Sequence, residues 1–383
     1  MEFDVTWMLL GLPVAFVLGW LASRFDLRQL RAENRRAPKA YFKGLNFLLN
    51  EQQDQAIDAF IEAVQNDPDT SELHFALGNL FRRRGEYDRA VRVHEHLLSR
   101  GDLSRTDRER AQHALALDFL KAGLLDRAEV ALQRLEGTPF EAEARMALLA
   151  IYERSSDWPQ AAAIADKMDR AAQGDFSTRQ AHYLCEQAAA QVAVGQTDEA
   201  RRLLEKAITT APAAARARIE LAALQQTAGD QAAAFQTLRQ VADAAPAAMP
   251  LAAARLAQAA AACGQVDTAL ALLDRSYDSA PSLDVLEAMV TLQEGSQGLQ
   301  AREAYVRHLE REPSLVAAAK WLAGERLEHE QFHPQVQRAL DHAVKPLTRY
   351  RCAACGFEAK QHFWQCPGCQ TWDSYPARRV EEL

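Results

Sequence analysis

The sequence predicts an all-α protein: a stack of paired helices that follows one membrane-spanning helix and precedes a small metal-binding module. Three patterns predict this: an uncharged apolar stretch near the start, a glycine-containing turn that recurs along the chain, and two cysteine pairs near the end. Hydrophobic residues make up 48% of the 383 residues and aromatic ones only 8%, so Ala and Leu, which favour helices, dominate the apolar content. The net charge of −8 argues against nucleic acid as the main partner.

Residues 5–23 carry no charged side chain and are long enough to cross a bilayer, since ~20 apolar residues in a helix span its hydrocarbon core. Trp7 and Trp20 lie near the two ends of this stretch, where interfacial indoles are common. A cleaved signal peptide is the alternative, but Glu2 and Asp4 are unlike the basic start of such peptides. We therefore expect residues 1–24 to form a transmembrane anchor.

A basic segment follows the predicted anchor and indicates its orientation. Positive charge beside a membrane helix marks the cytoplasmic side, so we expect the bulk of the chain in the cytoplasm, behind a basic juxtamembrane linker at residues 25–37. The same charges could contact anionic lipid head groups. The basic residues are Arg24, Arg28, Arg31, Arg35, Arg36 and Lys39.

A turn signature, Gly-x-x-Asp-x-Ala, occurs at residues 85–90, 123–128, 195–200 and 264–269. Glycine can end one helix in the left-handed conformation, the aspartate is expected to cap the next helix, and alanine allows the two helices to approach closely. Prolines 212, 246, 281 and 313 then follow at spacings of 34, 35 and 32. This period is typical of tetratricopeptide repeats, which stack into a superhelix with a concave groove. We count eight units between about Pro38 and Pro313 and assign residues 38–345 to the array.

Other residues of the array allow structural and functional interpretations. Ala56 and Ala90 fall 34 residues apart at the predicted close contact between paired helices. Arg82, Arg83 and Arg84 either complement a helix C-terminus or form a basic edge for an acidic partner. The His94-Glu95-His96 segment lacks the i, i+4 histidine spacing of a helical zinc site, so we expect a solvated or capping cluster there.

The end of the chain, residues 346–383, contains two cysteine pairs: Cys352-x2-Cys355 and, ten residues later, Cys366-x2-Cys369. Four thiolates in two such knuckles form a tetrahedral site for one zinc or iron ion. A site closed by four protein ligands is structural rather than hydrolytic. His362 is a less favoured rival ligand.

The predicted rubredoxin-like module has two further features: the residue that follows each knuckle and a set of aromatic side chains. Gly356 follows the first knuckle, but Gln370 follows the second, where glycine would be expected. The aromatic residues are expected to pack around the metal or against the last repeats. They are Phe357, Phe363, Trp364, Trp372 and Tyr375.

The sequence contains no recognisable catalytic motif. Cys185 and Cys263 are isolated in helical sequence and are expected to be small buried apolar residues. The chain contains no Walker A loop, no Gly-x-Ser-x-Gly elbow and no His-Glu-x-x-His motif. The sequence therefore predicts a protein that is not an enzyme.

The order of anchor, repeats and rubredoxin-like end resembles the lipopolysaccharide assembly protein B (LapB) family of Gram-negative bacteria. The segments Tyr41–Asp54, Leu77–Glu86 and Tyr350–Tyr375 carry the resemblance. It implies a non-catalytic inner-membrane adaptor that regulates lipopolysaccharide biosynthesis by linking the FtsH protease to degradation of LpxC, the deacetylase that commits precursor to lipid A. It also implies a second inner-membrane protein that antagonises this regulation.

Two other functions are left open by the residues. A rubredoxin-like electron-transfer protein would hold iron at the four cysteines, and a generic co-chaperone would clamp a C-terminal carboxylate in the groove. No Lys, Arg and Asn clamp of that kind is identifiable in the sequence. The choice between iron and zinc, the residues that contact each partner, the number of well-formed central repeats and a homodimer also stay open.

Overall fold

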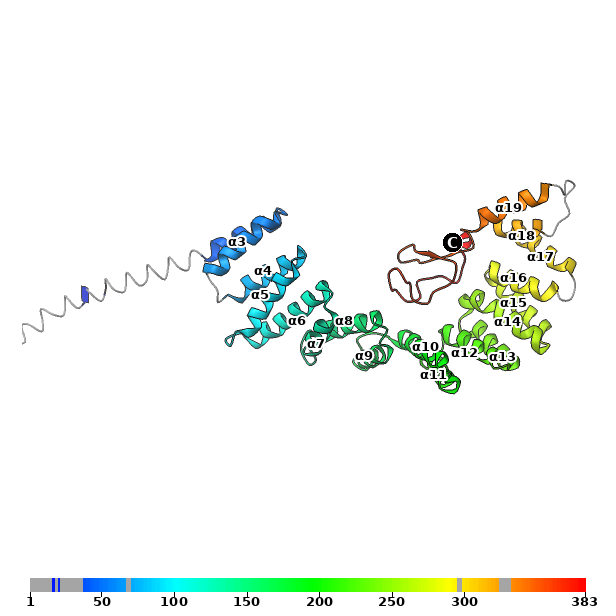
Figure 1. The fold of residues 1–383 in the computed structure, drawn as a ribbon, viewed down its shortest axis with the longest axis horizontal. Helices are drawn as coiled ribbons and strands as arrows, with labels where there is room; N and C mark the ends of the chain where they lie inside the picture. Colours follow the sequence, from blue (N-terminus) through cyan, green and yellow to red (C-terminus); the bar gives the residue numbers. More distant parts are fainter. Residues whose placement is uncertain (1–15, 18–19, 21–36, 67–69, 295–297, 324–331) are drawn as a thin grey trace, which may run out of the picture. The chain divides into compact units, whose positions relative to one another are not determined.

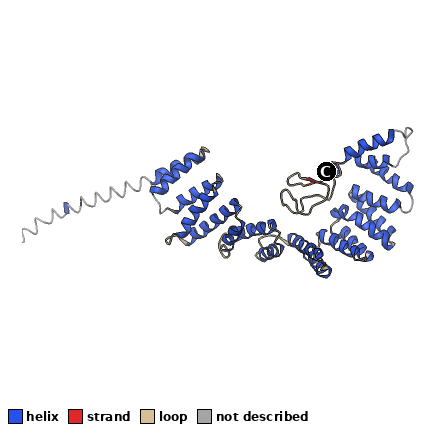
Figure 2. Cartoon of the chain, viewed as in Figure 1, coloured by secondary structure: helices blue, strands red, loops and turns tan. Residues whose placement is uncertain are grey.

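The computed structural model describes residues 16–17, 20, 37–66, 70–294, 298–323 and 332–383. In that part of the chain helices dominate, and a small ribbon follows them (Figures 1 and 2). The α-helices are α2 (Ala37–Leu49), α3 (Gln53–Asn66), α4 (Ser71–Arg83), α5 (Tyr87–Ser99), α6 (Arg105–Ala122), α7 (Leu125–Gln133), α8 (Glu141–Arg154), α9 (Trp158–Arg170), α10 (Ser177–Ala193), α11 (Thr197–Thr210), α12 (Arg216–Thr227), α13 (Gln231–Ala244), α14 (Met249–Cys263), α15 (Val266–Ser279), α16 (Leu283–Glu294), α17 (Gly298–Arg311), α18 (Leu315–Ala323) and α19 (His333–Val344).

The predicted helical repeat array is confirmed. Within the described residues, the helices from Ala37 to Arg311 follow one another as eight successive pairs, and α18 with α19 adds a ninth. The chain divides into two compact units, Met1–Ile151 and Tyr152–Leu383. The predicted anchor at 1–24 and linker at 25–37 lie almost entirely outside the described residues. No described helix is both long and apolar enough to cross a membrane, so the anchor stays a prediction.

The four glycine turns adopt the expected backbone. Gly85, Gly123, Gly195 and Gly264 have φ angles of 81°, 75°, 80° and 72°, in the left-handed region that glycine enters without a steric penalty. The residue after each glycine donates its amide proton to a carbonyl of the preceding helix, for example Glu86 N to Phe81 O at 2.9 Å. These bonds satisfy carbonyls that the helix end would otherwise leave unpaired.

The expectation that the signature aspartates cap the second helix is wrong. Helix α5 begins at Tyr87, so Asp88 is already its second residue, and the side chain of the preceding Glu86 accepts no capping hydrogen bond. Asp88 instead places negative charge at the positive end of the helix dipole. True caps occur where aspartate directly precedes the helix: Asp157 accepts from Gln160 N and Asp230 accepts from Ala233 N.

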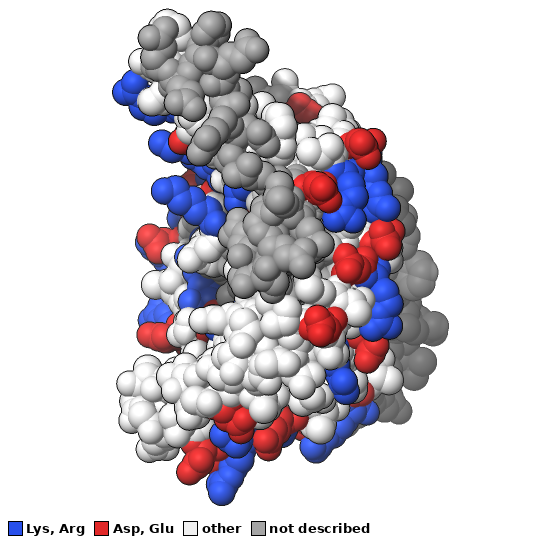
Figure 3. Space-filling view, turned by 90° about the vertical axis from the view of Figure 1, so that its right-hand side faces the viewer, with Lys and Arg blue, Asp and Glu red and all other residues white. Residues whose placement is uncertain are grey.

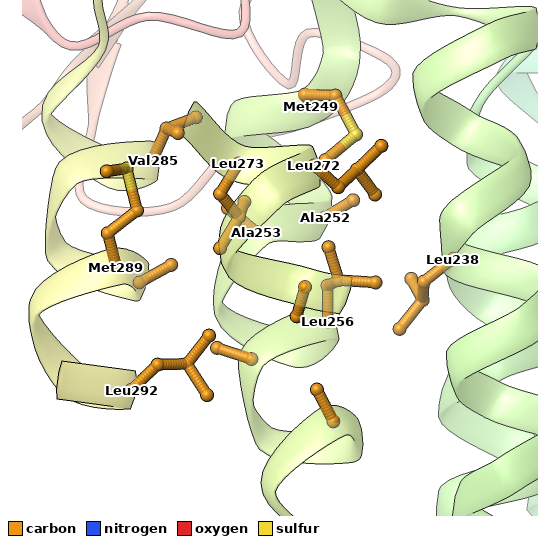
Figure 4. Packing of buried hydrophobic residues seen from close by; sticks show 14 of the residues in the cluster. Leu238, Met249, Ala252, Ala253, Leu256, Leu272, Leu273, Val285, Met289 and Leu292 are labelled. Atoms are coloured by element: carbon orange, nitrogen blue, oxygen red, sulfur yellow. The ribbon is translucent and has the colours of Figure 1, made fainter. Parts of the chain in front are cut away.

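The core of the second unit explains its many alanines (Figure 4). Leu238, Met249, Leu256 and Leu273 are fully buried, and they come from the consecutive helices α13, α14 and α15. Small buried residues on α14, such as Ala253, fill the space between these larger side chains. Alanine at such positions lets α14 contact both of its neighbours at close range, which makes added volume costly.

We expect Ala90→Leu to destabilise the array by about 1–3 kcal/mol, because overpacking a buried position forces neighbouring side chains off their preferred rotamers. Ala90 is fully buried on α5, at the predicted close-contact position, as is Ala56 on α3. Thermal unfolding followed by circular dichroism measures the effect. Ala163→Leu, at an exposed position of α9, is the matched control. Equal melting curves for the two variants would contradict the predicted register.

The expectation of a solvated or capping cluster at His94 is wrong. The residue is fully buried. Its Nδ1 lies 2.5 Å from the Asp118 carboxylate, which also accepts a 2.9 Å hydrogen bond from Arg82. His94 stands 34 residues after the buried Phe60 and fills the equivalent place in the next repeat. A Cβ added to Gly78 would lie 2.5 Å from the His94 ring, and a Cβ added to Gly44 would lie 2.9 Å from the Phe60 ring. The repeat position, rather than the histidine spacing, decides its burial.

Two of the three consecutive arginines are held in ion pairs. Arg82 bonds to Asp118 and Arg84 pairs with Asp54 and Glu86. On the face shown in Figure 3, Lys and Arg side chains are interspersed with Asp and Glu. Among the described residues visible on that face, the two signs of charge alternate and form no continuous basic track of the kind that binds nucleic acid.

Candidate metal centre

The metal module is built from two knuckles on a minimal ribbon. Strand β1 (Tyr350–Arg351) pairs antiparallel with β2 (Glu358–Ala359), and the first knuckle connects them. Each knuckle closes with an amide-to-carbonyl bond, from Gly356 N to Cys352 O at 2.9 Å and from Gln370 N to Cys366 O at 2.8 Å. Gln370 has a φ of 61°, so it adopts the left-handed conformation that Gly356 adopts at 76°. The missing glycine is thus replaced without a change of turn.

The four predicted ligands lie together. The sulfur atoms of Cys352, Cys355, Cys366 and Cys369 all lie within 4.8 Å of one another. The Cys352–Cys369 and Cys355–Cys366 sulfur distances are 3.8 Å and 3.7 Å. A tetrahedron with metal–sulfur bonds of ~2.3 Å has edges of about 3.8 Å, so the donor set fits one tetrahedral ion. Zinc and iron both suit four thiolates.

The surroundings favour the thiolate form at two of the thiols, Cys352 and Cys369. Burial opposes ionisation of Cys352, but hydrogen bonds with the Ser374 hydroxyl and with the amides of Cys355 and Ala354 outweigh it and lower its pKa to about 6. The hydroxyl and amide of Thr371 lower the pKa of Cys369. At Cys355 the amide of Phe357 also lowers the pKa, but burial and hydrogen bonds with the other three sulfurs outweigh it and raise the pKa to about 12. Thiolate is the form that binds metal, so the donors around Cys352 and Cys369 prepare these two sulfurs for an ion.

The remaining candidate ligands lie elsewhere. His362 points its Nε2 at the Tyr375 carbonyl at 3.0 Å and is not in the sulfur cluster. Cys185 is buried among the apolar residues of α10 and α11, and burial raises the pKa of its thiol strongly. Cys263 ends α14 and packs against the core of the second unit, but it is only partly buried, so the expectation of a buried residue is wrong at this position.

The ribbon is seated on the array within the second unit. Asp373 lies 2.9 Å from His182 Nε2, and the Trp372 ring stacks on the His182 ring with centroids 4.7 Å apart. The indole of Trp372 also donates to Glu153 at 3.0 Å. Phe363 and Tyr375 pack with the ligand cysteines, in line with the expectation that the aromatic residues lie around the metal or against the last repeats. Trp372 does neither: it packs against α8–α10, in the middle of the array.

The last repeats instead hold the C-terminal residues. Arg379 forms a two-pronged ion pair with Asp284, at 2.9 Å from Nε and 2.7 Å from Nη2, and its guanidinium lies over the Tyr350 ring. Such fork-to-fork pairs fix orientation as well as charge. Glu381 and Glu382 accept hydrogen bonds from backbone amides at the starts of α18 and α16.

Sequence reasoning missed these array residues, although one signal was present. His182, Arg216, Leu251 and Asp284 lie near the starts of α10, α12, α14 and α16, at spacings of 34, 35 and 33. His182 and Asp284 bind the ribbon and its tail directly, Leu251 packs with the buried Cys352 and Cys366, and Arg216 lies 3.5 Å from His182. These four residues, which we call the docking row, occupy one position of successive repeats, and the residue type at that position differs from repeat to repeat.

Comparison with known proteins agrees with both parts of the chain. The rubredoxin metal binding domain family matches residues 350–375, and tetratricopeptide repeat families match residues 73–109 and 185–249. With the clustered sulfurs, the first match confirms the predicted cofactor, one metal ion held by four cysteines.

Curated relatives match from end to end. Lipopolysaccharide assembly protein B of Escherichia coli is 31% identical over 385 residues, which cover 98% of this chain and 99% of the relative. The protein of the same name from Haemophilus influenzae is 28% identical over 383 residues, 96% of each chain. Among solved structures, a tetratricopeptide repeat protein from Parabacteroides merdae is 16% identical with a TM-score of 0.33, covering 67% of this chain and 98% of that chain.

Proposed function

Since the chain belongs to the lipopolysaccharide assembly protein B family, we propose that it is a non-catalytic adaptor of the bacterial inner membrane that regulates lipopolysaccharide biosynthesis. The observation that carries this proposal is the end-to-end match, which includes the array and the metal module together. Tetratricopeptide arrays bind proteins, which suits an adaptor.

The proposed mechanism couples the FtsH protease to degradation of the LpxC deacetylase. Residues 1–24 would anchor the chain beside the protease, residues 25–37 would lie at the cytoplasmic membrane surface, and the array at 38–345 would present the deacetylase. Tethering raises the effective concentration of one partner for the other without any new contact. A second inner-membrane protein would oppose this coupling.

The four thiolates of the 346–383 module are proposed to hold a structural ion through Cys352, Cys355, Cys366 and Cys369. Four protein ligands leave no open coordination position for a hydrolytic water. The seating of Trp372 and Asp373 on α10 supports a role in shaping the array surface.

Removing residues 1–24 tests the proposal. We expect the shortened chain to remain folded, because the repeats bury their own core, and the half-life of the deacetylase in the native host to rise. Immunoblots after translation arrest measure that half-life, and an unrelated transmembrane helix in place of residues 1–24 is the control that should restore turnover. Normal turnover with the untethered chain would refute the role of anchoring.

Electron transfer is the second candidate, because Cys355 and Cys369 are exposed while Cys352 and Cys366 are buried. An iron ion with two exposed ligands would supply one-electron chemistry at the surface. Metal analysis of protein from iron-replete native cells separates the two functions: stoichiometric zinc would exclude electron transfer.

A further inference from the structure

Helices α16 and α18, the first helices of two successive pairs, each begin at the leucine of the same tripeptide, Pro-Ser-Leu, at 281–283 and 313–315. The C-terminal tail, which we define as residues 378–383, supplies one carboxylate to each helix start. Glu382 accepts from Leu283 N at 2.6 Å, and Glu381 accepts from Leu315 N at 2.5 Å. Both helix starts are therefore carboxylate-binding positions in this chain.

The two starts differ in their serines. Ser314 donates to the second oxygen of Glu381 at 2.8 Å and accepts from Ala317 N at 2.9 Å. Ser282, at the equivalent position, is 1% exposed, and its hydroxyl has no hydrogen-bond partner within the described residues. Buried hydroxyls are usually paired, so the start of α16 lacks an acceptor that the start of α18 has.

A cavity of about 450 Å³ lies where that acceptor is missing, and Ser282 is one of its lining residues. Arg275 of α15 and Arg378 of the tail bring two positive charges to it. Arg378 also faces the tail carboxyl of Glu382: burial raises the pKa of that carboxyl, and the charge of Arg378 partly offsets the rise. Asp243 contributes one negative charge, and Met249 and Leu272 give the wall an apolar part.

We propose that this cavity binds one carboxylate of an acidic peptide segment from a protein partner. Arg275 and Arg378 would pair with the carboxylate, and the Ser282 hydroxyl would donate to it as Ser314 donates to Glu381. The apolar wall suits a leucine-sized neighbour in the peptide. Asp243 in the wall and Glu382 beside Arg378 offset part of the positive charge, which suits a single carboxylate better than a more highly charged phosphate. The inference goes beyond the proposed function, since it holds whichever partners the adaptor serves.

The test uses the purified full chain and a fluorescein-labelled Ala-Leu-Glu-Leu-Ala peptide, with binding followed by fluorescence anisotropy. Ser282→Ala and Arg275→Gln are each expected to weaken binding about tenfold, as loss of a charge-assisted hydrogen bond does. Arg239→Gln, at an exposed position of α13 outside the cavity, is the control and should bind normally. Because Ser282 has no partner to lose, Ser282→Ala should not lower the melting temperature.

Four competitors separate the possible ligands. The unlabelled glutamate peptide should displace the probe, whereas its Leu-Gln-Leu counterpart, inorganic phosphate and phosphatidylglycerol vesicles should not. Displacement by phosphate or vesicles at equal concentration would overturn the assignment to a peptide carboxylate. Wild-type affinity in both Ser282→Ala and Arg275→Gln would overturn the site itself. Neither variant alters a residue that holds Glu381 or Glu382, so loosening of the tail cannot produce the expected loss.

Discussion

Replacing Cys366 by serine is expected to abolish stoichiometric metal binding and to unfold the chain from about Tyr350 onward. Cys366 is fully buried, and the ribbon has only two short strands of its own, so the metal supplies its stability. Structural zinc sites contribute ~10–16 kcal/mol of binding free energy that is also folding free energy. Metal content by mass spectrometry and indole fluorescence of Trp364 and Trp372 measure the two effects.

The array should survive this change, because each repeat is stabilised by its neighbours. Helical circular dichroism should therefore fall only slightly, while the amides of Leu283 and Leu315 should exchange faster once the tail no longer supplies Glu382 and Glu381. Cys263→Ser, outside the sulfur cluster, is the matched control and should keep its metal. A full equivalent of metal in Cys366→Ser would show that the four-thiolate assignment is wrong.

The features that could be predicted from the sequence are those fixed by neighbouring residues. The turn at Gly85 follows from one residue that tolerates a positive φ, and the turn of the first knuckle follows from Cys352, Cys355 and Gly356 within five positions. The repeat period also predicts which residues pack between helices, since Ala56 and Ala90 stand 34 residues apart and are both buried. The anchor at 1–24 rests on composition and stays a prediction.

The features that were missed depend on contacts between distant residues. Asp373 and His182 are 191 positions apart, and no local pattern connects an acidic residue after a knuckle with a histidine at a helix start. The expectation of a solvated or capping cluster at His94 rested on the missing i, i+4 histidine spacing, whereas the place of His94 opposite Gly78 was already defined by Phe60 and Gly44. Comparing repeats position by position would have corrected the second error but not the first.

Comparing repeats position by position also leads to a prediction for the buried network of Asp118, His94 and Arg82. Asp118→Ala is expected to destabilise the first unit by about 3–5 kcal/mol, because removing one member of a buried charged group leaves its partners unpaired. Asp118 and His94 are both fully buried, so water cannot replace the lost carboxylate. Urea unfolding followed by circular dichroism measures the change, and Asp126→Ala, at an exposed position on α7, should cost no more than about 1 kcal/mol.

The paired variant His94→Phe with Asp118→Leu should recover most of that loss. Phe60 already fills the equivalent place one repeat earlier, and a buried charged pair is often replaced by apolar residues without loss of stability. Arg82 would keep its hydrogen bonds to Asn79 and the Ala114 carbonyl, and its side chain is 19% exposed, so water can reach it. If the paired variant is as unstable as Asp118→Ala, the cost comes from the Arg82 guanidinium, which loses its carboxylate in both variants, rather than from the buried histidine.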